Sequence, residues 1–313
     1  MNELPLVSIC CATYNHASFI HQCLDGIINQ KTNFPIEVLI NDDASTDGTA
    51  DIIKEYEQKY PEIIKPVYQT ENQHSKKLPI SRVYIFPRIK GKYMAICEGD
   101  DYWTDENKLQ KQVDFLENNS DYSICFHSYH KYYEEDKRLE KKNPDWVNKN
   151  SYTIKDLASG NLIGNLSVMY RYNKEVFEDL NNFPILGMGD YILHMLFAKH
   201  GSIMELPEVM AVYRIHKNGI WSMKNVKIQT SIYLKVLAAL IFHFMDDQEI
   251  CAILVEQYKK HSAILYPEIH ETPLIAENKN LKDKLDGLYN SNSWRITKPL
   301  RLISSFLKRN KIT

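Results

Sequence analysis

The stretch YMAICEGDDYW, residues 93–103, decides how the chain folds. Its first five residues are mostly apolar and predict a buried strand. Three carboxylates follow at once, on Glu98, Asp100 and Asp101. Two like charges about 4 Å apart repel by about 4 kcal/mol at an effective dielectric constant of about 20. The cluster therefore needs a cation, a shared proton or wide exposure to solvent.

Apolar runs and amphipathic helical patterns alternate over the first 133 residues. The predicted strands are residues 6–12, 36–42, 63–69, 93–97 and 122–133, and the predicted helices are residues 19–28, 50–60 and 107–119. Thr104 is the expected N-cap of the last helix, and Pro87 ends or kinks any helix before residue 93. This alternation is typical of βαβ units and predicts an α/β fold, a mostly parallel sheet with helices on both faces.

Composition excludes several classes of protein. The chain has 313 residues and a formal net charge of −2, which gives no reason to expect a nucleic-acid partner. Its six cysteines form no CxxC pair, which favours reduced thiols and a cytoplasmic location. The N-terminus lacks the basic region of a signal peptide. The longest apolar run, near Val236–Met245, is too short to span a bilayer, so we expect a soluble or peripheral protein.

The acidic residues fall where open α/β sheets bind ligands, beyond the carboxyl ends of strands. Asp42 and Asp43 end the second predicted strand, and the Glu98–Asp101 cluster ends the fourth. Side chains alternate across a strand, so Glu98 and Asp100 should point to one side and Asp101 to the other. Such an acid-x-acid pair chelates Mg²⁺ or Mn²⁺, which would place a diphosphate here. The alternative is a solvated loop in which an aspartate only caps the following helix.

Three segments together carry a family resemblance: VSICCATYN at residues 7–15, IEVLINDDASTDGT at residues 36–49 and KGKYMAICEGDDYW at residues 90–103. They resemble the nucleotide-sugar domain of family 2 inverting glycosyltransferases, which have the GT-A fold. The resemblance covers roughly residues 5–220. It implies a GT-A domain over residues 1–222, with a nucleotide-sugar half to about residue 120 and an acceptor half after it. A helical region, residues 223–313, follows.

The resemblance also implies roles for individual residues. Asp100 becomes the leading ligand of a Mg²⁺ or Mn²⁺ ion, and its neighbours in the acidic segment contact the donor. The remaining donor-binding residues that it implies are Thr13, Tyr14, Asn15, Asp42, Asp43, Glu98 and Asp101. Glu98 stands where the family more usually has aspartate. Arg82 keeps the family's position in altered surroundings, so it either contacts the donor or is an ordinary surface cation.

Glycosyl transfer needs a base that removes a proton from the acceptor hydroxyl. In the resembling family an acidic residue that opens the acceptor-side helix acts as this base, and Asp190 in GMGDYILHMLF matches it. Alternatively, Asp190 is only a helix N-cap. His216, after the next predicted strand, is a second metal ligand or a structural histidine. Trp221 stacks on a sugar or lies in the core.

These features predict a metal-dependent inverting glycosyltransferase acting on a nucleoside diphosphate sugar. Uridine diphosphate sugars are the default donor by family analogy. The acceptor is then a hydroxyl of a glycan or lipid-linked saccharide in bacterial surface polysaccharide assembly. The turn after the first predicted strand, ATYNHAS, has no glycine, which excludes a dinucleotide-dependent dehydrogenase. The alternative is a catalytically weak nucleotide-sugar-binding or scaffolding subunit.

The last residues, 293–313, combine a basic and an apolar helical face. Such a helix can lie on an anionic membrane surface, and each cation near that surface contributes about 1 kcal/mol. A similar tail occurs on bacterial surface-polysaccharide glycosyltransferases. The sequence therefore predicts a cytoplasmic protein that is peripheral on the inner face of the plasma membrane. The alternative is that the tail packs on the protein itself.

Overall fold

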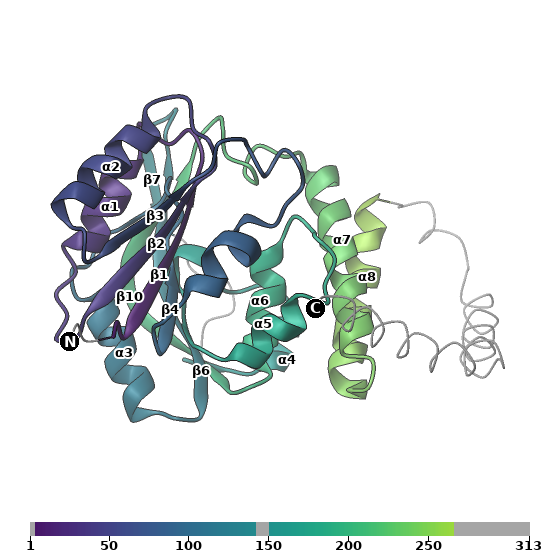
Figure 1. The fold of residues 1–313 in the computed structure, drawn as a ribbon. Coiled ribbons are helices and arrows are strands. Elements are labelled where there is room, and N and C mark those ends of the chain that lie inside the picture. The colour runs from purple at the N-terminus through teal and green to yellow at the C-terminus, as the bar shows by residue number, and fades with distance from the viewer. Residues whose placement is uncertain (1–3, 142–149, 266–313) are drawn as a thin grey trace, which may run out of the picture. The chain divides into compact units, whose positions relative to one another are not determined.

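The computed structural model describes residues 4–141 and 150–265, and one ten-stranded sheet runs through it (Figure 1). The strand order is β3-β2-β1-β4-β9-β6-β10-β5, with β7 paired to β6 and β8 paired to β10. The strands are β1 Val7–Thr13, β2 Ile36–Asp42, β3 Ile64–Tyr68, β4 Tyr93–Ile96, β5 Tyr102–Trp103, β6 Tyr122–Tyr133, β7 Arg138–Lys141, β8 Ser151–Tyr152, β9 Met169–Arg171 and β10 Ser202–Ile215.

Strand direction determines where the loops meet. β3, β2, β1 and β4 are parallel to one another. β9 is antiparallel to both β4 and β6, and β10 is parallel to β6. The strands β1, β2, β4, β6 and β10 therefore all point the same way and end at the same edge of the sheet. The prediction of a mostly parallel sheet is confirmed.

Helices cover both faces of this sheet, as predicted (Figure 1). They are α1 Ile20–Ile28, α2 Thr49–Lys59, α3 Lys108–Asn118, α4 Ile154–Ala158, α5 Lys174–Leu180, α6 Gly189–Ala198, α7 Val226–His243 and α8 Gln248–Leu265. Three short turns of other helix types are η1 Ser81–Ile85, η2 Phe86–Arg88 and η3 Asn165–Ser167. Pro87 lies in η2, where the short helical segment ends, as its ring requires.

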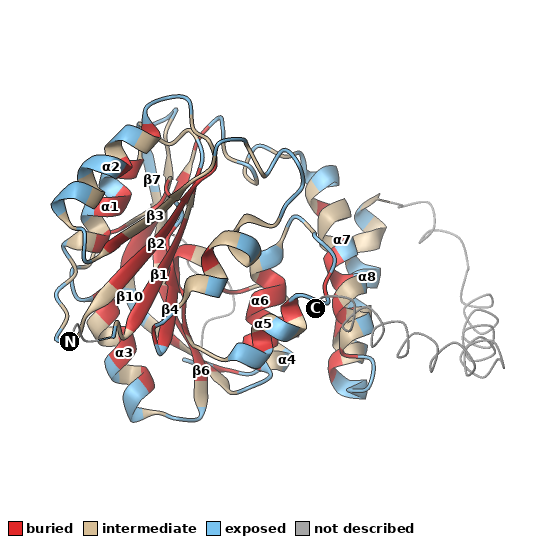
Figure 2. Cartoon of the chain, in the orientation of Figure 1, coloured by how far each residue is buried: buried red, intermediate tan, exposed pale blue. Residues whose placement is uncertain are grey.

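Alternation along the strands divides the core between the two faces. In β1, Ile9 and Cys11 belong to a buried cluster with α1, α2 and α3. Cys10, between them, belongs to a second cluster with α4, α5 and α6. Because both sets are buried, the strands have apolar residues at successive positions (Figure 2). This explains why the sequence shows continuous apolar runs rather than alternation.

The third predicted helix, residues 107–119, is observed as α3, but its N-cap differs from the prediction. Asn107, not Thr104, occupies the N-cap position of α3, and the N–H of Asn107 donates to Oδ1 of Asp105 at 2.8 Å. The Thr104 prediction is wrong because the N–H of Thr104 donates to the carbonyl of Met210 in β10 at 2.9 Å and so extends the pairing of β5. Asp105 therefore organises the helix entry.

The helix α7 shares a core with the preceding elements. Val236, Leu237 and Leu240 are buried in the same cluster as Tyr191 of α6. The first compact unit of the chain extends to His261, beyond the predicted boundary at residue 222. The division into a GT-A domain and a helical region remains a prediction, and residues 266–313, with the basic tail, lie outside the described residues.

By length and composition alone, α7 is apolar enough to cross a membrane. Its 18 residues have a mean hydropathy of 1.2, and 28% of them are buried. The apolar run near Val236–Met245, from which the sequence analysis judged the length, therefore covers only part of this apolar helix. One such helix is weak evidence for a span, because a core helix meets the same criterion.

A lysine lies fully buried behind the sheet. Lys108 is 0% exposed, its Nζ donates to Oε1 of Gln112 at 2.8 Å, and the ammonium lies 3.9 Å from the Trp103 ring centroid. Burial lowers the pKa of Lys108 from 10.5 to about 7. The unfolded chain therefore binds more protons than the folded chain between these two values.

We expect the free energy of unfolding to rise with pH above about 7, with a slope of up to about 1.4 kcal/mol per pH unit from this group. Lys108→Met should flatten that slope in urea unfolding measured from pH 7 to 10. Lys54→Met, at an exposed ion pair with Asp51, is the matched control and should keep the wild-type slope. An identical slope in wild type and Lys108→Met would contradict the prediction.

Candidate active site

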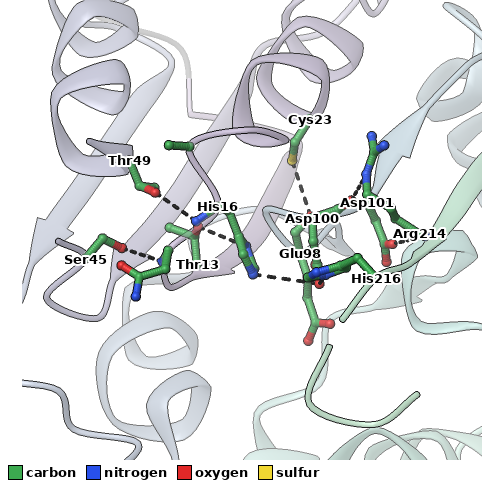
Figure 3. A network of polar contacts seen from close by, with 12 residues as sticks. Thr13, His16, Cys23, Ser45, Thr49, Glu98, Asp100, Asp101, Arg214 and His216 are labelled. Atoms are coloured by element: carbon green, nitrogen blue, oxygen red, sulfur yellow. Dashed lines mark hydrogen bonds and ion pairs between the residues drawn. The ribbon is translucent and has the colours of Figure 1, made fainter. Parts of the chain in front are cut away.

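The residues at the ends of four strands meet at the carboxyl edge of the sheet. Thr13 ends β1 and pairs in register with Asp42, which ends β2. The Glu98–Asp101 turn follows β4, and His216 follows β10. The parallel strands thus place residues from four distant segments at one edge, as Figure 3 shows for the segments after β1, β4 and β10.

Asp100 is the centre of the polar contacts at this edge. Its Oδ2 lies 3.2 Å from Nε2 of His216 and 3.8 Å from Nε2 of His16 (Figure 3). Burial opposes ionisation of Asp100, but the His216 hydrogen bond and the nearby imidazole of His16 outweigh it, so the pKa of Asp100 is lowered. Its carboxylate is therefore charged, partly screened from water and flanked by two rings.

Asp101 and Arg214 fasten the acidic turn to β10. The backbone N–H of Arg214 donates to Oδ1 of Asp101 at 2.9 Å, and Nε of Arg214 donates to the carbonyl of Asp100 at 2.8 Å. The guanidinium also pairs with Glu134 and donates to Gln22 Oε1 at 2.6 Å. Arg214 is 5% exposed, so it positions the turn rather than meeting a ligand.

Glu98 and Asp190 lie close enough to influence each other. Part of the Glu98 side chain reaches solvent, and its Oε1 accepts from Nδ2 of Asn165 at 3.3 Å. Protein packed around the carboxylate raises the pKa of Glu98 to about 8, and the charges of Asp100 and then Asp190 add to the shift. Asp190 therefore lies near enough to the Glu98–Asp101 turn for its charge to act on Glu98.

Asp190 is the second residue of α6, and Met188 occupies the N-cap position. The alternative that Asp190 is the N-cap is therefore wrong. Burial raises the pKa of Asp190, while backbone N–H groups of Asp190 and Tyr191 partly offset this effect. A carboxylate with a raised pKa is a better proton acceptor than an ordinary aspartate.

The two aspartates after β2 have different surroundings. Both oxygens of Asp43 accept backbone N–H bonds, from Gln73 at 2.8 Å and His74 at 3.0 Å. Asp42 accepts from the N–H of Ser45 at 3.2 Å, and its Oδ1 is buried with no partner among the described residues. Asp43 therefore holds the loop after β3, and Asp42 keeps an open acceptor.

The turn after β1 is fixed by the loop after β2. The N–H of Asn15 donates to Ser45 Oγ at 2.8 Å, and Asn15 Oδ1 accepts from the N–H of Thr46 at 2.8 Å. Asn15 has a φ of 54°, a left-handed conformation that asparagine tolerates better than most residues. Tyr14, 43% exposed, projects from this fixed turn and is free to contact a ligand.

Two other predicted residues lie in different settings. Nη1 of Arg82, in η1, donates to the carbonyl of Phe183 at 2.9 Å, so Arg82 supports the segment that leads to α6. Trp221 is half-buried in the loop between β10 and α7. Trp103, by contrast, is 3% exposed and donates from Nε1 to the carbonyl of Leu166 at 2.9 Å. It is a core residue.

His16 is a site residue that the sequence analysis did not identify. Its position directly after Thr13-Tyr14-Asn15 was the available signal, but no spacing rule relates that turn to Asp100. Among the described residues, two groups could hold a metal ion: His16, Asp100 and His216, and Glu98, Asp100 and Asp101. Within each group the candidate ligand atoms lie within 4.8 Å of one another, so the donor set fits a divalent cation.

We expect Arg214→Met to lower the free energy of unfolding by about 3 kcal/mol, because it leaves Glu134 and the Asp100 carbonyl without a buried cation. Urea unfolding measures this loss. Arg138→Met is the matched control, since it breaks an exposed pair with Glu140 that contributes less than about 1 kcal/mol. Equal losses in the two variants would show that Arg214 does not fasten the turn.

Comparison with known proteins agrees with this architecture. The family description "Glycosyl transferase family 2" matches residues 8–180. The chain is 38% identical to the uncharacterized protein Rv1520 of Mycobacterium tuberculosis over 219 residues, which are 69% of this chain and 60% of that protein. It is 30% identical to TuaG of Bacillus subtilis, a putative teichuronic acid biosynthesis glycosyltransferase, over 71% of this chain and 84% of that protein.

Among solved structures, that of S. aureus TarS in complex with UDP-GlcNAc superposes with a TM-score of 0.58 at 15% identity, covering 85% of this chain and 76% of that chain. This similarity concerns the fold, and it confirms the expected GT-A architecture. The chain spans 60% of the length of Rv1520, so its relatives include longer proteins. The family match and the sequence relatives lead to one conclusion: the chain belongs to glycosyl transferase family 2.

Proposed function

We propose that the protein is a metal-dependent, inverting glycosyltransferase that uses a uridine diphosphate sugar. Its acceptor is a hydroxyl of a glycan or lipid-linked saccharide in bacterial surface polysaccharide assembly. One observation carries the proposal: the turn after β4 holds Asp100, with His16 and His216 at 3.8 and 3.2 Å, and Glu98, whose pKa is raised in part by the nearby charge of Asp190. A donor-side cluster and a proton acceptor are therefore close together.

The proposed step is a single displacement. The acceptor oxygen attacks the anomeric carbon from the face opposite the diphosphate, and the bond from that carbon to the diphosphate oxygen breaks. The electron pair of this bond leaves with the diphosphate, and the acceptor proton moves to Asp190. A divalent cation, when bound, supplies positive charge that offsets the charge on the leaving group. Inversion at the anomeric carbon follows from the single attack.

Different observations support the proposed class of donor and the proposed class of acceptor. TarS, which shares the fold, binds UDP-GlcNAc, and this favours a uridine diphosphate sugar here. TuaG is named for teichuronic acid biosynthesis, and this favours a polysaccharide acceptor. On the protein side, the unpaired Oδ1 of Asp42 offers an acceptor to a donor such as a base N–H or a ribose hydroxyl.

We expect Asp190→Asn to reduce kcat by about 10²–10⁴-fold and to leave binding of the donor unchanged, because the variant loses only the proton acceptor. A base must be unprotonated, so wild-type kcat/KM should fall as pH drops through the raised pKa of Asp190. The pH at which kcat/KM is half-maximal should therefore lie above 3.8. The residual activity of Asp190→Asn should not show this fall at low pH. Transfer assays over a panel of nucleotide sugars measure both effects.

Asp100→Asn separates the enzyme from the scaffolding alternative. In an enzyme this variant also loses turnover, and it additionally weakens donor binding that depends on Mg²⁺ or Mn²⁺, measured by calorimetry. A scaffolding subunit would lose no turnover in either variant, and its partner binding would be unchanged. That result would overturn the proposed function.

We also propose a cytoplasmic location with peripheral attachment to the inner face of the plasma membrane. The predicted tail lies outside the described residues, but residues 217–245, which comprise the loop after β10 and the helix α7, support the idea. Residues 217–245 include Lys217, Lys224, Lys227 and Lys235 and no acidic residue. Ile220, Met223 and Val226 are 65%, 57% and 64% exposed in the same segment. Basic and apolar side chains together suit an anionic lipid surface.

Deletion of residues 293–313 should release most of the protein from anionic vesicles, since each cation near the surface contributes about 1 kcal/mol to binding. Co-sedimentation with phosphatidylglycerol vesicles measures the bound fraction, and neutral phosphatidylcholine vesicles are the control. Binding that is unchanged by the deletion would refute the role of the tail. If the deletion leaves vesicle binding unchanged but Lys224→Glu and Lys227→Glu abolish it, membrane binding is due to residues 217–245 instead.

A further inference from the structure

Two histidines, one after β1 and one after β10, approach the same oxygen atom. Nε2 of His216 lies 3.2 Å from Oδ2 of Asp100, and Nε2 of His16 lies 3.8 Å from it (Figure 3). The two rings meet edge to face with their centroids 6.1 Å apart. The three side chains therefore converge on one point, although they come from segments that are far apart in the sequence.

The His16 ring is held in this orientation before any ligand arrives. Its Nδ1 lies 3.2 Å from Oγ1 of Thr13, which leaves Nε2 directed at Asp100. Its backbone N–H donates to Oγ1 of Thr49 at 2.8 Å, and Phe19 packs against the ring at a centroid distance of 6.3 Å. A hydrogen bond to the second ring nitrogen is the usual way in which proteins orient a metal-binding imidazole.

The competing group of three carboxylates is less suitable for a metal. Oδ1 of Asp101 accepts the Arg214 N–H at 2.9 Å, and Asp101 is 3% exposed, so this carboxylate is committed to the fold. Oε1 of Glu98 accepts from Asn165 at 3.3 Å. Figure 3 marks no contact from Glu98 to either imidazole, whereas Asp100 is joined to His216. Asp100 is therefore oriented toward the two histidines.

We infer that His16 is a ligand of the donor-site metal, which is held by His16, Asp100 and His216 as two imidazole nitrogens and one carboxylate. This inference rests on the proposed function only for what the ion does. Which residues bind the ion is inferred from the contacts alone. Mg²⁺ prefers oxygen ligands, whereas Mn²⁺, although it too is well served by carboxylates, is a transition metal that also accepts imidazole nitrogens. Three protein ligands leave further coordination positions open for diphosphate oxygens.

The test is a titration of the full chain with Mn²⁺ alone, followed by electron paramagnetic resonance without nucleotide sugar. Removing an outer-shell partner of a metal costs about 10–100-fold in affinity, so loss of a direct ligand in His16→Gln should weaken Mn²⁺ binding by at least about tenfold. Glu98→Gln is the matched control and should bind Mn²⁺ close to the wild-type affinity. Mg²⁺ at equal concentration should fail to displace Mn²⁺ from the wild type.

Pulsed electron paramagnetic resonance gives a second readout. Bound Mn²⁺ should couple to two nitrogen nuclei in the wild type and to one in His16→Gln. The urea midpoint of each variant shows whether it folds, and if His16→Gln does not, the nitrogen couplings of the wild type decide. No Mn²⁺ binding by the wild type, no nitrogen coupling, or loss of binding in Glu98→Gln alone would overturn the inference. Absence of sugar transfer would count against the proposed function and leave these spectra unaffected.

Discussion

The contact between Arg214 and the Asp100–Asp101 turn is the constraint on which the site depends. Both bonds, at 2.9 Å and 2.8 Å, join the end of β10 to the turn after β4. They fix the register at which His216 leaves the sheet, and this brings its ring to 3.2 Å from Asp100. Since Asp101 accepts the backbone N–H of Arg214, the third carboxylate of the cluster is structural. Burial and the charge of Asp100 raise the pKa of Asp101, which favours a proton on that carboxyl and so reduces the repulsion expected among three adjacent acids.

Much of the fold follows from the sequence for a simple reason. The strands are buried on both faces, so each forms a continuous apolar run, and each parallel strand requires an intervening crossover. The run at residues 36–42 corresponds residue for residue to β2. Because parallel strands end at a common edge, Thr13 and Asp42 could be placed together without coordinates. For His216 the sequence left a metal ligand and a structural histidine as alternatives, because its place at this edge depends on the order β6-β10, which the sequence does not encode locally.

Other features of the site depend on contacts between residues far apart in the sequence, and hydrophobic periodicity does not report such contacts. No pattern around Arg214 in the sequence indicates burial, yet it lies buried among Gln22, Glu134 and the Asp100 carbonyl. His16 was missed because its approach to Asp100 depends on the left-handed turn at Asn15, φ 54°. A turn of this kind reverses the direction of a side chain, and no residue pattern at β1 reports where that side chain then points.

Asp42 and Asp43 are neighbours in one motif, but their carboxylates have different hydrogen-bond partners. Asp43 uses both oxygens to hold the backbone of Gln73 and His74, so replacing it disturbs a loop. Asp42 retains a buried acceptor with no partner in the described part of the chain, and burial raises its pKa. An unsatisfied buried acceptor costs about 1–3 kcal/mol. A ligand that donates a hydrogen bond to Asp42 recovers this free energy on binding, whereas Asp43 has none to recover. The pair therefore combines a fixed loop with an acceptor that is stabilised only in the complex.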